Sequence, residues 1–185
     1  GLQIVAVFGQ AHAQAALEAV ARGLRSAPAG APDVAAALRC RRGLLLAVAA
    51  RLAEAERDIR AGAELARAAH DPRAEALCLR SLATHEQLRG DVDASIATLR
   101  RAAELRRVIH DRSGRAVVLM VLFDHLRMMG EIGEAAALVT EARAEAEASH
   151  NLYAVASASL LMGATALTLG DHVAAGEHVE RAVAG

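Results

Sequence analysis

A period of forty residues constrains the fold of this 185-residue chain more than any other feature of its sequence. Two kinds of dipeptide mark the period, a glycine followed by an acidic residue and a histidine followed by Asp or Asn. They stand at Gly90-Asp91, Gly130-Glu131 and Gly170-Asp171, and at His70-Asp71, His110-Asp111 and His150-Asn151. A sustained period of this length is typical of stacked helical hairpins. We therefore predict an all-α fold, a right-handed α-solenoid of stacked antiparallel helix pairs.

The register divides a single domain, residues 1–185, into a partial repeat and four copies of the unit. In each copy we expect a first helix that ends at a turn near Ala50, Gly90, Gly130 or Gly170, and a second helix that ends at the next histidine joint. The partial amino-terminal repeat covers residues 1–30, and the copies cover residues 31–70, 71–110, 111–150 and 151–185. Because the chain starts with Gly and the last copy stops short, we expect a piece excised from a larger protein.

Small residues recur at fixed places in the unit, at Gly43, Ala83 and Gly163 in the first helix and at Ala55, Ser95, Ala135 and Ala175 in the second. Small side chains let neighbouring helices approach closely. The pattern resembles the tetratricopeptide repeat, with departures. Phe123 stands where the third copy should have its small residue, and each unit has forty residues instead of about thirty-four. In addition, Arg42 stands where the other copies have Leu82, Leu122 and Met162.

Repeats of this longer type resemble those of bacterial multidomain transcriptional regulators, such as the large ATP-binding LuxR-type activators and the actinobacterial antibiotic-regulatory family. The resemblance implies that the first helices line a concave groove that binds a ligand or partner. The groove positions of the family, carried across by register, include the polar or flexible residues Arg80, Thr84, Gln87, Met120, Asp124 and Arg127 in the second and third copies. The other positions in these copies are the apolar residues Leu77, Leu88, Val117 and Met128.

Four of these groove residues, Arg80, Gln87, Asp124 and Arg127, would form a polar island in a mainly apolar surface. The island can satisfy itself if either arginine pairs with Asp124. If a ligand binds there, it should be anionic or carry a carboxylate, because two guanidinium groups face a single acid.

No motif in the sequence points to catalysis, to a metal or to a cofactor. Gly-rich phosphate loops, HExxH and CxxC are absent, and the net charge of −1 lacks the basic surplus of a dedicated nucleic-acid-binding domain. His85 and His125 are forty residues apart, but nothing completes a metal site around them. We assign His70, His110 and His150 to helix C-termini, where imidazole can meet the last carbonyl groups. We therefore predict no catalytic residue, no metal ligand and no cofactor, and a protein that is not an enzyme.

The two cysteines, Cys40 and Cys78, lie in apolar helical patterns without the spacing of a metal or redox motif. We expect buried free thiols, and hence a reducing, cytoplasmic compartment. The apolar run at residues 2–8 is too short for a membrane span and lacks the basic leader of a signal peptide.

Two classes of function follow. The first is a non-catalytic protein-interaction or effector-sensing module of a bacterial transcriptional regulator. Its partner would be a protein, a peptide or a small anionic effector, without direct contact to nucleic acid or membrane. The second is a purely structural module that buries its apolar face in a homodimer or against missing domains. In either case we expect self-association through an apolar terminal face.

Overall fold

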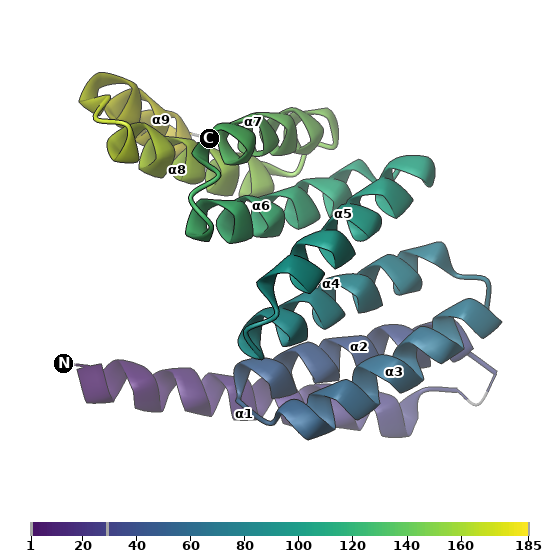
Figure 1. Ribbon diagram of the computed structural model, residues 1–185. Coiled ribbons are helices and arrows are strands. Elements are labelled where there is room, and N and C mark those ends of the chain that lie inside the picture. Colours follow the sequence, from purple (N-terminus) through teal and green to yellow (C-terminus); the bar gives the residue numbers. More distant parts are fainter. Residues whose placement is uncertain (1, 29, 185) are drawn as a thin grey trace. The chain divides into compact units, whose positions relative to one another are not determined.

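The computed structural model describes residues 2–28 and 30–184, with side chains described from residue 14 to residue 183 except at 29. These residues form nine helices and no strand (Figure 1), so the predicted all-α class is confirmed. The helices are α1 (Leu2–Ser26), α2 (Pro32–Val48), α3 (Leu52–Ala68), α4 (Pro72–Leu88), α5 (Val92–Val108), α6 (Arg112–Met128), α7 (Ile132–Ala148), α8 (Leu152–Thr168) and α9 (His172–Ala184). In the repeat register, α2, α4, α6 and α8 are first helices, and α3, α5, α7 and α9 are second helices.

Each of the seven joints from α2 to α9 contains one residue in the left-handed backbone conformation. The φ angles are 87°, 84° and 81° at Gly90, Gly130 and Gly170, 50°, 56° and 53° at His70, His110 and His150, and 60° at Ala50. At the first histidine joint, the backbone N–H of His70 donates to the Arg67 carbonyl (3.1 Å) and that of Asp71 donates to the Ala66 carbonyl (2.9 Å). This is the Schellman arrangement, and it stops the helix.

The histidines therefore lie at helix C-termini as predicted, but backbone N–H groups bind the last carbonyls in place of the imidazoles. The residue after each histidine starts the next helix. Asp71 Oδ1 accepts hydrogen bonds from the backbone N–H groups of Arg73 (2.9 Å) and Ala74 (3.1 Å), and Asn151 Oδ1 accepts one from Ala154 (3.0 Å). The repeated dipeptide thus ends one helix and caps the next.

The chain divides into two compact units, Gly1–Thr98 and Leu99–Gly185, which we describe separately. In unit 1, α2 packs against α1, α3 and α4. In unit 2, α7 packs against α6 and α8, α8 packs against α9, and the first helices α6 and α8 touch. Within each unit, neighbouring first helices therefore lie together in one layer.

Small residues are required where helices of unit 1 touch. A Cβ atom added to Gly62 of α3 would overlap Cys40 Sγ and lie 2.9 Å from the Ala36 carbonyl oxygen of α2. In unit 2 the sequence departs from the small-residue column at Phe123, and this ring is fully buried (0% exposed). The core of unit 2 is thus filled by a large side chain at a position where the repeat pattern calls for a small one.

The prediction of free thiols is wrong, because Cys40 of α2 and Cys78 of α4 form a disulfide, with their Cα atoms 5.0 Å apart. Their separation of 38 residues is close to one repeat, which places them on adjacent first helices. Both side chains are buried, at 0% and 2% exposed. The inference from free thiols to a reducing compartment therefore loses its basis, and a cytoplasmic location stays a prediction. Within the described part of the chain, every helix is too short or too polar to cross a bilayer.

Candidate functional site

The predicted groove residues of unit 1 lie on α4 and are partly buried. The Thr84 hydroxyl donates to the Arg80 carbonyl of its own helix (3.3 Å). Arg80 and Gln87 each interact with another group of the protein. Thr84 is therefore held in place by its helix, and Arg80 and Gln87 are ordered on the same face.

The predicted groove residues of unit 2 lie on α6. Arg127 Nη2 forms an ion pair with Asp124 Oδ1 at 3.8 Å, and the two side chains are 45% and 49% exposed. An exposed pair of this kind stabilises a helix by about 0.5 kcal/mol or less. Met120 packs against a cluster of Ala116, Ala146 and Ala154. The island draws on residues of both units, so its assembly stays a prediction.

Large apolar side chains recur at the last position of successive first helices. Val48, Leu88 and Met128 end α2, α4 and α6, and they are 65%, 48% and 56% exposed. In α8, Leu160 and Leu167 are 50% and 54% exposed. Within each unit, we call the surface formed by its share of these residues and of the predicted groove residues the first-helix face of that unit.

Three cavities share one register: each is lined by a first helix (α2, α4 or α8), by the helix before it, and by residues at or after the turn that follows it. We name them by repeat: crevice 1 has a volume of about 340 Å³, crevice 2 about 580 Å³ and crevice 4 about 190 Å³. Three columns supply equivalent wall positions, namely Arg42, Leu82 and Met162, then Leu46, Glu86 and Ala166, then Arg51, Asp91 and Asp171. The fold thus repeats one cavity and lines it with different chemistry each time.

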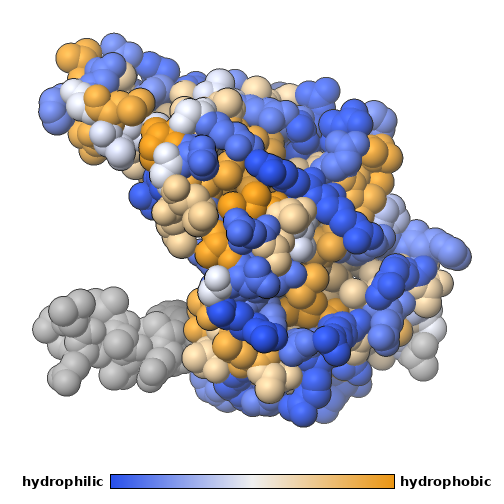
Figure 2. Space-filling model, in the orientation of Figure 1, coloured by the Kyte–Doolittle hydropathy of each residue, from blue (hydrophilic) through white to orange (hydrophobic). Residues whose placement is uncertain are grey.

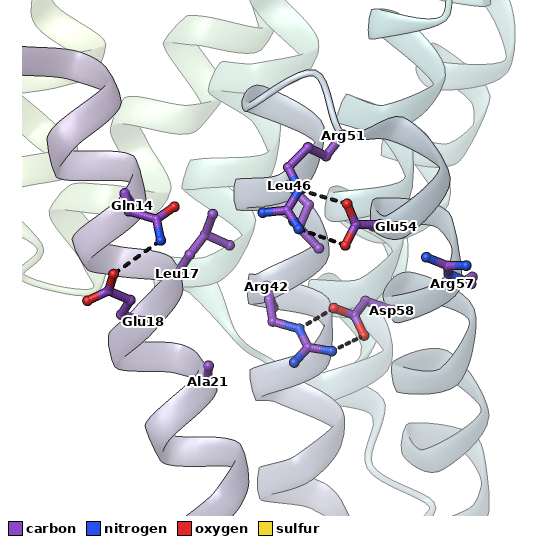
Figure 3. Close-up of a pocket in the computed structure, with 10 residues that line it drawn as sticks. All are labelled: Gln14, Leu17, Glu18, Ala21, Arg42, Leu46, Arg51, Glu54, Arg57 and Asp58. Carbon is purple, nitrogen blue, oxygen red and sulfur yellow. Dashed lines mark hydrogen bonds and ion pairs between the residues drawn. The ribbon is translucent and has the colours of Figure 1, made fainter. Parts of the chain in front are cut away.

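Crevice 1 lies between α1, α2 and α3 and is dominated by a buried ion pair (Figure 3). Asp58 is 5% exposed, and the Arg42 guanidinium donates to both of its carboxylate oxygens, with Nη2 2.6 Å from Oδ1. Arg39 Nη1 adds a longer contact at 3.4 Å. The hydrogen bond to Asp58 raises the pKa of Arg42. Arg42 is the residue that breaks the apolar column, so the sequence signals a departure here, but the repeat register alone does not pair Arg42 with Asp58.

The other polar groups of crevice 1 are also paired. Arg51 donates twice to Glu54, each time at 2.7 Å, and Gln14 Nε2 donates to Glu18 Oε1 at 3.1 Å (Figure 3). An ionic ligand would have to open at least one of these pairs to bind. The ion pair of Arg42 and Asp58 in crevice 1 therefore links α2 to α3 and is not available for a ligand.

The two buried histidines of the repeat register make different contacts. His85 is 3% exposed, and its Nε2–H donates to the Leu52 carbonyl at the start of α3 (3.2 Å). His125 is 2% exposed, and its Nδ1–H donates to the Val121 carbonyl of its own helix (2.7 Å). Among the described side chains, no three metal-ligating groups come together.

Comparison with known proteins identifies the fold. No family model matches the sequence, and no curated protein matches it. Among solved structures, aspartyl phosphate phosphatase F from Bacillus subtilis is similar over 80% of this chain, with a TM-score of 0.72 and 14% identity. BtubC (BKLC) from P. vanneervenii is similar over 97% of this chain and 73% of its own, with a TM-score of 0.69 and 16% identity. The fold is a tetratricopeptide-like helical repeat.

At these identities the likeness shows the fold alone. This tetratricopeptide-like chain spans only 39% of the length of the phosphatase. Activity and partners therefore have to be argued from the residues of this chain itself.

Proposed function

We propose that this helical-repeat chain is a non-catalytic binding module, and that its first-helix face receives a protein segment. The exposed apolar side chains of Val48, Leu88 and Met128 carry the proposal. In unit 1, Val48 and Leu88 stand one repeat apart on neighbouring first helices, and Met128 holds the same position of the repeat in unit 2. Recurring exposed apolar groups of this size mark interaction surfaces. Following the sequence resemblance, we place the module in a bacterial transcriptional regulator.

The charges of the face define the occupant. On α6, Arg127 stands against Asp124, and the ion pair of these two side chains is long and half exposed. A carboxylate of the ligand can replace this weak contact with a forked hydrogen bond to a guanidinium. The best-fitting occupant is an acidic peptide segment with apolar anchors, and a small anionic effector is the alternative within the same class.

The polar clusters support a binding role over an enzymatic one. Arg42 and Asp58 close on each other, and the imidazole of His85 is fixed on a backbone carbonyl. Structural contacts within the protein therefore account for both of these polar groups.

Selection of peptides from a displayed library, followed by binding titrations on variants, tests the proposal. Leu88→Gln should weaken binding of a selected peptide at least tenfold, because an apolar anchor of the face is lost. Val108→Gln is the matched control, since Val108 is also the last residue of a 17-residue helix and is 58% exposed, but lies on the second helix α5. Equal effects of the two changes would contradict the proposal.

A second candidate function, assembly, is supported by the α8–α9 end of unit 2. Tyr153 of α8 is 81% exposed, and Val173 and Val183 of α9 are 76% and 82% exposed. Figure 2 shows hydrophobic atoms among polar ones at this end. If assembly is the function, sedimentation equilibrium should show a dimer that Val173→Asp dissociates and that Leu88→Gln leaves intact. A monomer at high protein concentration would exclude this candidate.

A further inference from the structure

Glu86 interrupts a column of apolar core residues. Its equivalents in the first and third copies, Leu46 and Leu126, are 5% and 3% exposed, and the fourth copy has Ala166. A carboxylate at such a position costs solvation free energy that a leucine would not. The second copy therefore departs from its own repeat pattern at the wall of crevice 2.

The carboxylate of Glu86 is only half satisfied. One oxygen accepts a hydrogen bond from the Thr98 hydroxyl, whereas Oε2 is buried without a hydrogen-bond partner. Burial raises the pKa of Glu86. Buried polar atoms are nearly always paired, so an orphan oxygen in the wall of a cavity indicates a missing donor.

Crevice 2 is large enough to hold that donor as part of a small molecule. Its volume of about 580 Å³ lies in the range of small-molecule sites, and Ile59, Ala63 and Leu82 supply apolar wall. The equivalent crevice 4, which has Ala166 in place of Glu86, has a volume of about 190 Å³. Of these two equivalent cavities, the one with the Glu86 carboxylate in its wall is therefore the larger.

Arginine side chains also line crevice 2. Arg60 is paired with Glu56 (2.6 Å), and Arg67 donates to the Ala63 carbonyl (3.2 Å). Arg89, three residues after Glu86 and exposed, forms no ion pair within the described part of the chain. Groups of both charges line the crevice, since Glu56, Glu64 and Asp91 lie there with Glu86, and Arg60 and Arg67 lie there with Arg89. A molecule with both charges satisfies both.

We propose that crevice 2 binds a small zwitterion, an α-amino acid with an apolar side chain. Its ammonium group donates to Glu86 Oε2, its carboxylate accepts from Arg89, and its side chain lies against Ile59 and Leu82. Glu86 and Arg89 lie on the opposite side of α4 from Arg80, Thr84 and Gln87. The amino-acid site is therefore distinct from the first-helix face, and one can fail without the other.

Calorimetric titration of the chain with three related probes tests the site. L-leucine has both charges, L-leucinamide lacks the carboxylate and N-acetyl-L-leucine lacks the ammonium group. We expect L-leucine to bind and each analogue to bind at least tenfold more weakly, because each loses one charge-assisted hydrogen bond. Failure of all apolar amino acids to bind at about 10 mM, or equal binding of the three leucine probes, would overturn the proposal.

Variants separate recognition from structural roles. Glu86→Gln should weaken L-leucine at least tenfold and leave N-acetyl-L-leucine unchanged, and Arg89→Gln should weaken L-leucine and leave L-leucinamide unchanged. Arg73→Gln, an exposed change on the same helix outside the crevice, is the control that should alter neither. Glu86→Leu restores the apolar column, so it should fold at least as stably as the parent chain and not bind. A Glu86→Leu chain that is less stable and still binds L-leucine would contradict the assignment.

Discussion

Unit 1 and unit 2 repeat the same helices at the same spacing but join their first helices by different means. In unit 1, the disulfide of Cys40 and Cys78 links α2 to α4. Eighty residues later, the equivalent positions on α6 and α8 hold Met120, which packs in an alanine cluster, and Ala158, which is fully buried. The backbone period therefore does not depend on either kind of contact.

The same contrast holds on the side of the second helices. The buried pair Arg42 and Asp58 of unit 1 corresponds to Leu122 and Leu138 in unit 2, and Glu86 corresponds to Ala166. The joints and the small residues determine the forty-residue period of the backbone. The residue types at the remaining core positions differ between the two units. The two departures that place a charge in an apolar column, Arg42 and Glu86, both lie in unit 1, and they are therefore the better guide to function.

The largest contrast in packing is between Phe123 of unit 2 and Gly43, its equivalent in unit 1. Phe123→Ala should lower the free energy of unfolding by about 3–5 kcal/mol, because a fully buried ring is removed from a close-packed core. Urea unfolding followed by circular dichroism measures the loss. A loss below about 1 kcal/mol would mean that the core of unit 2 does not depend on this ring.

The disulfide contributes to unit 1 alone. Cys40→Ala together with Cys78→Ala should lower its stability by roughly 3–4 kcal/mol, given the chain entropy released by opening a loop of this length. Proteolysis should then cut unit 1 before unit 2, and dithiothreitol should have the same effect on the unchanged chain. Two titratable thiols in the denatured, unreduced chain would show that no disulfide exists.

The joints differ at Ala50, which has a φ of 60° where its unit 2 equivalent is Gly130, with a φ of 84°. Ala50→Gly should raise the free energy of unfolding by about 1 kcal/mol, because glycine adopts this conformation without a Cβ clash. Gly130→Ala should lower it by a similar amount. Thermal unfolding of both variants tests the pair, and changes of the same sign would contradict the assignment.

The smallest expected effect is the pH dependence from Glu86, which has no counterpart in unit 2. Burial raises its pKa in the folded state, so its contribution to stability is complete below the unfolded pKa and is lost as pH rises through the folded pKa. Glu86→Gln should therefore gain stability over the parent chain at pH 7 but not at pH 4. Melting curves of the variant and the parent chain at the two pH values measure this difference in stability. A gain in stability seen only at pH 4 would contradict the prediction.

The joints were predictable from the sequence, because Gly90, His110 and their equivalents mark backbone geometry directly. The disulfide was not, since cysteines 38 residues apart form no local motif and meet only through the stacking of two repeats. Arg42 stands out in the sequence as an exception to its column, but its partner Asp58 lies on another helix, where no local motif marks it. The orphan oxygen of Glu86 depends on the rotamer and on the cavity, which sequence register does not define.

Oxidative footprinting of two adjacent methionines tests the central claim, that the first-helix face is the binding surface. Met128 ends α6 on this face, and Met129 is the next residue, in the cap of the helix; they are 56% and 51% exposed. With a selected peptide bound, oxidation of Met128 should slow several-fold while that of Met129 stays unchanged. Equal rates for both methionines with and without the peptide would contradict the claim.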